Sequence, residues 1–155
     1  MNIKKLATTC LMLCVAASAL AQDDRFASVT IETVPVTGNI SMLIGSGGNI
    51  GVSTGSDGLL IIDDQYGPLA AKIRAALSQL RSDTPKFLLN THFHGDHTGG
   101  NADFGVASII IAHENVRGRL VAGDSPGSAL PVITFDEDVT VHFNGESITL
   151  IHMPR

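Results

Sequence analysis

Three histidines and one aspartate stand within six consecutive residues near the middle of the chain. The stretch THFHGDHTGGN contains His92, His94, Asp96 and His97 and directly follows the apolar strand-like run KFLLN. Imidazole nitrogens and carboxylate oxygens are zinc ligands, and two metals about 3.5–4 Å apart can activate one shared water. Packing does not require four such side chains together. The stretch therefore predicts a metal site, against the alternatives of a chance surface loop or a histidine-rich tract.

The spacing divides these four residues into two pairs. His92 and His94 are two residues apart, so both can point the same way and form half of a tetrahedral zinc site. Gly95 lets the backbone turn sharply, so Asp96 and His97 can face a second point a few ångströms away. One loop could thus hold parts of two adjacent metal sites. Three other histidines stand outside any ligand-spaced cluster and are assigned to packing or the surface: His113, His142 and His152.

The elements that must position this loop begin with strands. Short apolar runs bounded by glycine and asparagine predict a meander of three or four strands between about residues 28 and 62. The glycine-rich stretch 44–51 within it is interpreted as a hairpin turn, with a mobile flap over the site as the alternative. Apolar residues at helical spacing predict a helix over about 68–81, with Pro68 in its first turn and Pro85 closing the segment.

The second part of the pattern alternates strands and helices. KFLLN (86–90) and IIIAH (109–113) are continuous apolar runs typical of buried strands, and ENVRGRLV (114–121) predicts a short helix. Two or three further strands are expected within 132–153, with a hairpin turn at Asn144-Gly145. The order predicts an α/β (α+β) domain in which helices cover a sheet.

The histidine loop resembles the signature H-x-H-x-D-H loop of the metallo-β-lactamase superfamily. GLLIIDDQ (58–65) resembles the strand of that family which ends in a buried Asp, matched here by Asp63. The resemblance implies an αβ/βα sandwich, with two β-sheets face to face and helices outside. The chain would supply its N-terminal half plus a few strands.

Residue by residue, the resemblance implies that His92 and His94 bind a first metal and that Asp96 and His97 bind a second. It implies Zn²⁺, two per complete domain, with iron as an alternative because imidazole and carboxylate suit both metals. Asp96 would be the catalytic residue that orients or deprotonates the attacking water. Asp63 would be a supporting acid and not a ligand, with a plain strand-end turn residue as the other interpretation.

The segment ITLIHMPR (148–155) resembles the family strand that precedes the third histidine of the first metal. Further ligands are therefore expected beyond Arg155. Residues 22–155 are interpreted as an incomplete metallo-β-lactamase-like domain, the N-terminal part of a longer protein. Alone, this fragment is expected to fold poorly, to bind metal weakly and to be inactive.

Residues 1–21 predict a secretory signal peptide, because a basic start and an apolar run lead to a small-residue cleavage site after Ala21. Both cysteines lie in this leader, so the mature chain has no thiolate ligand or nucleophile. The formal charge of −5 becomes −7 on cleavage, since Lys4 and Lys5 leave with it. The prediction is a periplasmic or secreted protein that binds neither nucleic acid nor, once cleaved, a membrane.

Three functions remain open from the sequence. The first is an exported zinc hydrolase acting on a small-molecule lactam, lactone, thioester or other ester-like substrate. The second is an iron-dependent relative of the same fold that handles oxygen or sulfur compounds. The third is a non-catalytic exported module that only binds metal, although an acid placed like Asp96 favours catalysis.

Overall fold

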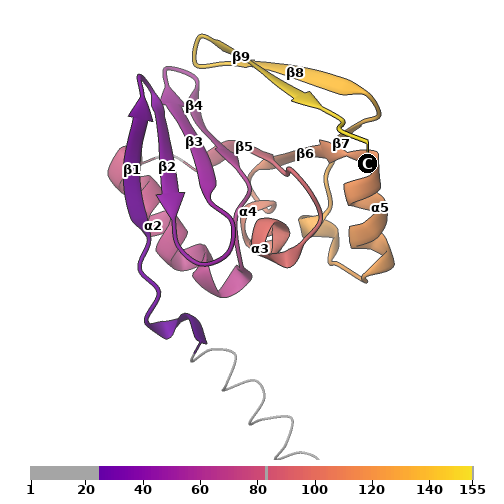
Figure 1. Cartoon of the computed structure of the whole chain (residues 1–155), viewed down its shortest axis with the longest axis horizontal. Coiled ribbons are helices and arrows are strands. Elements are labelled where there is room, and N and C mark those ends of the chain that lie inside the picture. The colour runs from indigo at the N-terminus through magenta and orange to yellow at the C-terminus, as the bar shows by residue number, and fades with distance from the viewer. Residues whose placement is uncertain (1–24, 83, 155) are drawn as a thin grey trace, which may run out of the picture.

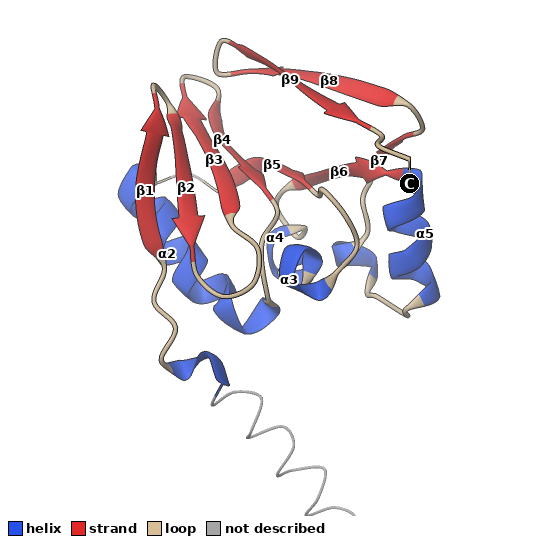
Figure 2. Ribbon diagram, viewed as in Figure 1, coloured by secondary structure: helices blue, strands red, loops and turns tan. Residues whose placement is uncertain are grey.

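The computed structural model describes residues 25–82 and 84–154 of the chain. The predicted signal peptide, residues 1–21, lies outside the described residues. A seven-stranded mixed sheet carries helices on one face and a separate two-stranded hairpin over the other (Figures 1 and 2). This confirms the predicted mixed α and β class. No helix in the described part of the chain has the length and apolar character needed to cross a membrane.

The strands of the large sheet lie side by side in chain order, and β1 to β4 form the predicted antiparallel meander. The last four strands are parallel to one another. The strands are β1 (Glu32–Thr37), β2 (Ile40–Ile44), β3 (Ile50–Gly55), β4 (Gly58–Ile62), β5 (Pro85–Leu89), β6 (Ile109–His113) and β7 (Ile133–Phe135). The hairpin consists of β8 (Asp138–Phe143) and β9 (Glu146–Ile151), joined at the predicted Asn144-Gly145 turn.

The described residues form more helical segments than the sequence predicted. The expected helix over 68–81 begins as a 3₁₀ turn that contains Pro68, and Pro85 opens β5 rather than only ending the helix. The helical segments are η1 (Gly67–Leu69), α2 (Ala70–Leu80), α3 (Gly95–Thr98), α4 (Asn101–Phe104), α5 (Glu114–Ala122) and η2 (Gly127–Ala129).

The central strands are buried on both faces, which explains their continuous apolar runs. Leu59, Ile61 and Leu88 pack with α2 in one core, whereas Leu60 and Leu89 pack with the hairpin in another. Neighbouring residues of a strand point to opposite faces, so each run contributes to both cores. Packing in both cores fixes the position and register of β4, β5 and β6. The polar residues of the site follow the ends of these strands.

Candidate metal centre

The polar residues gather at the carboxyl edge of the parallel strands, where a sheet of this kind places its site. Asp63 follows β4 directly, and Thr91 and His92 follow β5 after Asn90. Backbone hydrogen bonds tie the strand ends together, with Asp63 N donating to Leu89 O over 2.8 Å. The histidine loop therefore begins at a position that the sheet fixes.

The loop itself differs from the sequence prediction in its second half. His94 is extended, but Gly95 to Thr98 form the single helical turn α3, so Asp96 and His97 lie on a helix and not on an open loop. Gly95 has no positive φ, and a Cβ there would meet nothing within 4 Å. The change of direction thus comes from the start of the helix, and the expectation that it needs the freedom of glycine at Gly95 is wrong. Thr98 fixes the turn, donating its hydroxyl to the carbonyl of His94 at 3.1 Å.

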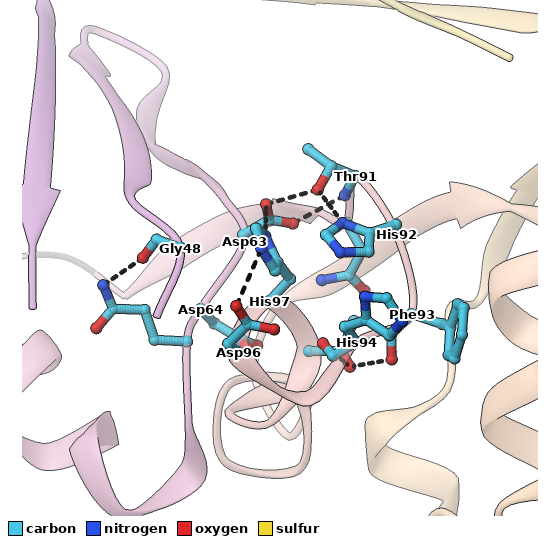
Figure 3. Close-up of polar contacts among 12 residues, drawn as sticks. Gly48, Asp63, Asp64, Thr91, His92, Phe93, His94, Asp96 and His97 are labelled. Carbon is cyan, nitrogen blue, oxygen red and sulfur yellow. Dashed lines mark hydrogen bonds and ion pairs between the residues drawn. The ribbon is translucent and has the colours of Figure 1, made fainter. Parts of the chain in front are cut away.

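Asp63 is the centre of the polar network (Figure 3). Its side chain accepts hydrogen bonds from Thr91 N at 2.8 Å and from Thr91 Oγ1 at 2.7 Å. The same carboxylate lies 2.7 Å from His97 Nδ1, and Thr91 Oγ1 lies 3.1 Å from His92 Nδ1. Asp63 is only 3 % exposed and has a φ of 63°, a left-handed conformation that a non-glycine residue adopts at a cost.

These contacts assign the tautomers of two imidazoles. The Nδ1–H of His97 donates to Asp63, and the Nδ1–H of His92 donates to Thr91 Oγ1, whose own proton goes to Asp63. The Nε2 atoms of both rings are thereby left free to bind a metal. A carboxylate behind a ligand histidine is the usual way in which a protein orients that ligand. The structure thus gives Asp63 the contacts of a supporting acid.

The four candidate ligands lie together in space. The ring of His92 is 4.0 Å from that of His97 and 4.9 Å from that of His94, between centroids. Asp96 Oδ2 is 3.5 Å from His97 Nε2. Two ligands of a tetrahedral zinc with bonds of about 2.0–2.1 Å lie about 3.3 Å apart, so this pair fits one metal ion. Within residues 25–82 and 84–154, no group of three or more His, Cys, Asp or Glu side chains is placed to hold a metal ion.

Electrostatics also suit metal binding at His92. Burial lowers the pKa of His92 below its usual value, and the adjacent imidazole of His97 lowers it further. The ring is therefore neutral near pH 7, which is the form that coordinates a metal.

A glycine-rich loop closes one side of the centre. The residues between β2 and β3 lie directly against α3: a Cβ on Gly47 would come within 2.5 Å of Asp96 Cβ, and one on Gly48 within 2.3 Å of the His97 ring. The buried amide of Gln65 holds this loop, since Nε2 donates to Gly48 O and Oε1 accepts from Ser46 N at 3.3 Å. The stretch is a hairpin connection, as predicted, and it is also a wall of the site.

Asp64 lies behind α3, with its N–H donating to His97 O at 3.1 Å, and is fully buried. Its Oδ1 accepts a hydrogen bond from Gly100 N at 2.9 Å, whereas its Oδ2 has no partner among the described residues. Burial raises the pKa of Asp64 to about 8, against the opposing effect of the Gly100 hydrogen bond. Asp64 is therefore neutral at pH 7 and is no metal ligand in this arrangement.

The opposite side of the centre is open. A cavity of about 560 Å³ extends from His92 and Phe93 between the sheet, α5 and the hairpin, with Ile148 and Leu150 of β9 in its wall. The guanidinium of Arg119, on α5, lies 4.5 Å from the centre of the Phe93 ring. The cavity is of the size that small-molecule sites have.

The three histidines outside the cluster each have other contacts. His113 is buried, with Nδ1 accepting from Asn115 N at 3.0 Å and Nε2 at 2.7 Å from Asp136 O. His142 is exposed on the hairpin, 3.0 Å from Ser147 Oγ. The exposed ring of His152 stacks on His113 at 3.9 Å. The assignment of these histidines to packing or surface agrees with these contacts.

The sequence missed Thr91, Gln65 and the packing role of the glycines. Thr91 stands directly before His92, so its position was a usable signal for a hydrogen bond to a neighbouring ligand. Gln65 carried no signal, because its role depends on a φ of 56° and on a loop 17 to 19 residues away.

A family model described as the metallo-beta-lactamase superfamily matches residues 35–154. The chain belongs to this superfamily, as the histidine loop predicted. No curated protein matches the chain.

Solved structures show the same fold. BJP-1, a subclass B3 metallo-beta-lactamase of Bradyrhizobium japonicum, is 23% identical with a TM-score of 0.68, and the match covers 79% of this chain and 52% of that one. The class B3 di-zinc metallo-beta-lactamase LRA-12 from an Alaskan soil metagenome has a TM-score of 0.70 at 20% identity, covering 82% and 54%. GOB-18 from Elizabethkingia meningoseptica has a TM-score of 0.70 at 20% identity, covering 81% and 52%. The chain spans about half the length of these structures.

Proposed function

We propose that the chain carries the metal-binding loop of a zinc-dependent hydrolase that cleaves a lactam, lactone, thioester or other ester-like bond. The observation that carries this proposal is the Asp63 network, which leaves Nε2 of His92 and of His97 free to coordinate. Membership of the superfamily and the metallo-beta-lactamase neighbours support the same chemistry. Asp96 and His97 fit one ion as a pair, and the neighbouring imidazoles of His92 and His94 supply further donors.

Zinc, when bound, lowers the pKa of a coordinated water and polarises a carbonyl oxygen. The residues of the chain orient the ligands, accept the proton of the water and exclude solvent. Asp63 keeps the rings of His92 and His97 in one tautomer and one orientation. The Asp96 side chain is 33% exposed, so its carboxylate can accept a hydrogen bond from the attacking water and take its proton. The glycine wall excludes solvent from one side.

We further propose that the protein acts outside the cytoplasm, on the strength of the leader over residues 1–21. The export signal favours a substrate met in the periplasm or medium, such as a β-lactam or a lactone. Detection of the mature chain beginning at Gln22 in a periplasmic or culture fraction would support this localisation, and a full-length chain retained in the cytoplasm would contradict it.

The test of the hydrolase is turnover by the full-length protein together with its metal content. A chromogenic cephalosporin, a lactone and a thioester are assayed with and without a chelator, and the metal of protein purified without added metal is measured. We expect zinc, and activity that the chelator abolishes. Bound iron would favour the oxygen- or sulfur-handling alternative. Tight metal binding with no turnover of any substrate would favour the non-catalytic module.

Asp96→Asn separates catalysis from metal binding. Because Asn cannot accept the water proton, we expect activity to fall about 10²- to 10⁴-fold while part of the metal is retained. Asp103→Asn is the matched control, since the Asp103 side chain is an exposed acid paired with Arg74. Equal activity of the two variants would remove Asp96 from the mechanism.

A further inference from the structure

Two side chains of α5 face the cavity that opens beside the histidine loop. Asn115 and Arg119 are four residues apart, so they lie on one face of the helix, and both line the cavity together with His92. Figure 1 shows α5 at the β7 end of the sheet, under the C-terminal end of the hairpin. The helix thus presents an amide and a guanidinium to the space next to the metal-binding residues.

The guanidinium of Arg119 contacts an aromatic ring and forms no ion pair within the described part of the chain. It stacks 4.5 Å above the ring of Phe93, a residue that stands between His92 and His94. Stacking uses the face of the guanidinium and leaves its N–H donors, which lie in the plane, available. Arg117, two residues earlier, differs because it donates to Pro131 O at 2.6 Å.

No carboxylate among residues 25–82 and 84–154 pairs with Arg119, and the side-chain amide of Asn115 has no hydrogen-bond partner there either. Asn115 uses only its backbone N–H, which donates to His113 Nδ1 at 3.0 Å. Both side chains are exposed. The cavity therefore has two donor side chains on α5 that a ligand can reach.

We propose that Asn115 and Arg119 form a subsite for the carboxylate of the substrate; this rests on the proposed hydrolase function. A guanidinium offers paired donors that match the two oxygens of a carboxylate. The apolar part of the remaining wall includes Phe135, Ile148 and Leu150. The substrate class is thus a carboxylate-bearing acyl compound with an apolar body, whose scissile carbonyl lies toward the histidines.

The decisive variant is Arg119→Gln in the full zinc-loaded chain. For a carboxylate-bearing substrate we expect KM to rise about tenfold with little change in kcat, because a charge-assisted hydrogen bond is lost from substrate binding. The methyl ester of the same substrate should show no change. Arg119→Lys keeps the charge but not the paired donors. Its KM for the carboxylate-bearing substrate should lie between those of the wild type and Arg119→Gln. Equal effects on acid and ester would overturn the proposal.

A binding measurement separates this subsite from the hydrolase proposal. Benzoate is titrated by NMR against the wild-type chain, Arg119→Gln and Arg74→Gln, with benzamide as the neutral probe. Arg74 is the matched control, because its guanidinium also stacks on a phenylalanine, 4.8 Å from the Phe104 ring, on α2. We expect weaker benzoate binding only in Arg119→Gln. If no substrate is turned over but benzoate binding is weaker only in Arg119→Gln, the hydrolase proposal is refuted and the subsite stands. If benzoate binding is equal in all three proteins, the subsite is refuted.

Discussion

The two flanks of the histidine loop are built in opposite ways. On the flank of Asp96 and His97, the glycine wall, Gln65 and Asp63 pack closely around the two side chains, of which Asp96 stays 33% exposed. On the flank of His92 and Phe93, a cavity of about 560 Å³ opens toward α5 and the hairpin. Figure 3 shows the crowded polar contacts on the first flank and Phe93 pointing away from them. Under the proposed function, the first flank would set the geometry of the candidate ligands and the second would receive the substrate.

Removing Asp63 should disturb the closed flank most. In Asp63→Ala the ring of His97 loses its acceptor, and Thr91, which holds the ring of His92, loses two hydrogen bonds. We expect zinc affinity to fall about 10- to 100-fold, the usual effect of losing the carboxylate behind a ligand histidine. A competition assay with a chromogenic chelator measures it.

The control for this variant is Thr91→Val, which keeps the His97 contact to Asp63 and removes the hydroxyl that links Asp63 to His92. A smaller loss of affinity is expected for it. If Asp63→Ala bound zinc as tightly as the wild type, the closed flank would not set the ligand geometry, and the comparison of the two flanks would fail.

The sequence predicted which residues gather at this site better than it predicted the contacts that hold them there. The candidate ligands could be predicted because the pattern H-x-H-x-D-H lies within six consecutive residues. Strands β4 to β6 could be predicted because strands buried on both faces are continuously apolar. The link from Asp63 to His97 joins residues 34 positions apart and depends on a left-handed φ at Asp63. No local pattern encodes such a contact.

The glycine wall illustrates the same limit. A hairpin connection was predicted correctly from glycine and asparagine, because turn propensity is a local property. That Gly47 and Gly48 are glycines because side chains of α3 press against them is a property of tertiary packing. The single helical turn of α3 was missed for a related reason: four residues are too few for a helical period to be seen.

Gly48→Ala tests whether the wall matters, with a smaller expected effect. The new Cβ would lie 2.3 Å from His97 Cε1, so either the loop or the ring must move. We expect zinc affinity to fall about tenfold by the same loss of ligand orientation, and benzoate binding at the open flank to remain unchanged. Gly127→Ala is the control, because a Cβ there would meet nothing within 4 Å. A loss of benzoate binding in Gly48→Ala alone would show that the two flanks are not independent.

The smallest expected effect concerns stability and Asp64, which lies under the closed flank. Its pKa is raised from 3.8 to about 8 by burial, so the folded state holds its proton more tightly than the unfolded state does. The stabilisation from this proton is complete below the unfolded pKa and is lost as the pH rises through about 8. Across that window the free energy of unfolding should fall by about 1 kcal/mol per pH unit from this group.

Asp64→Asn removes this dependence because the amide cannot ionise, while its oxygen can still accept the hydrogen bond from Gly100 N. Urea unfolding from about pH 5 to about pH 9 should show the free energy of unfolding of the variant increasing relative to that of the wild type as the pH rises. Asp124→Asn, a change at an exposed carboxyl, is the control. A constant difference between Asp64→Asn and the wild type at every pH would mean that Asp64 is ionised in the folded protein. The closed flank would then contain a buried charge, and its tight packing would need a cation that neutralises it.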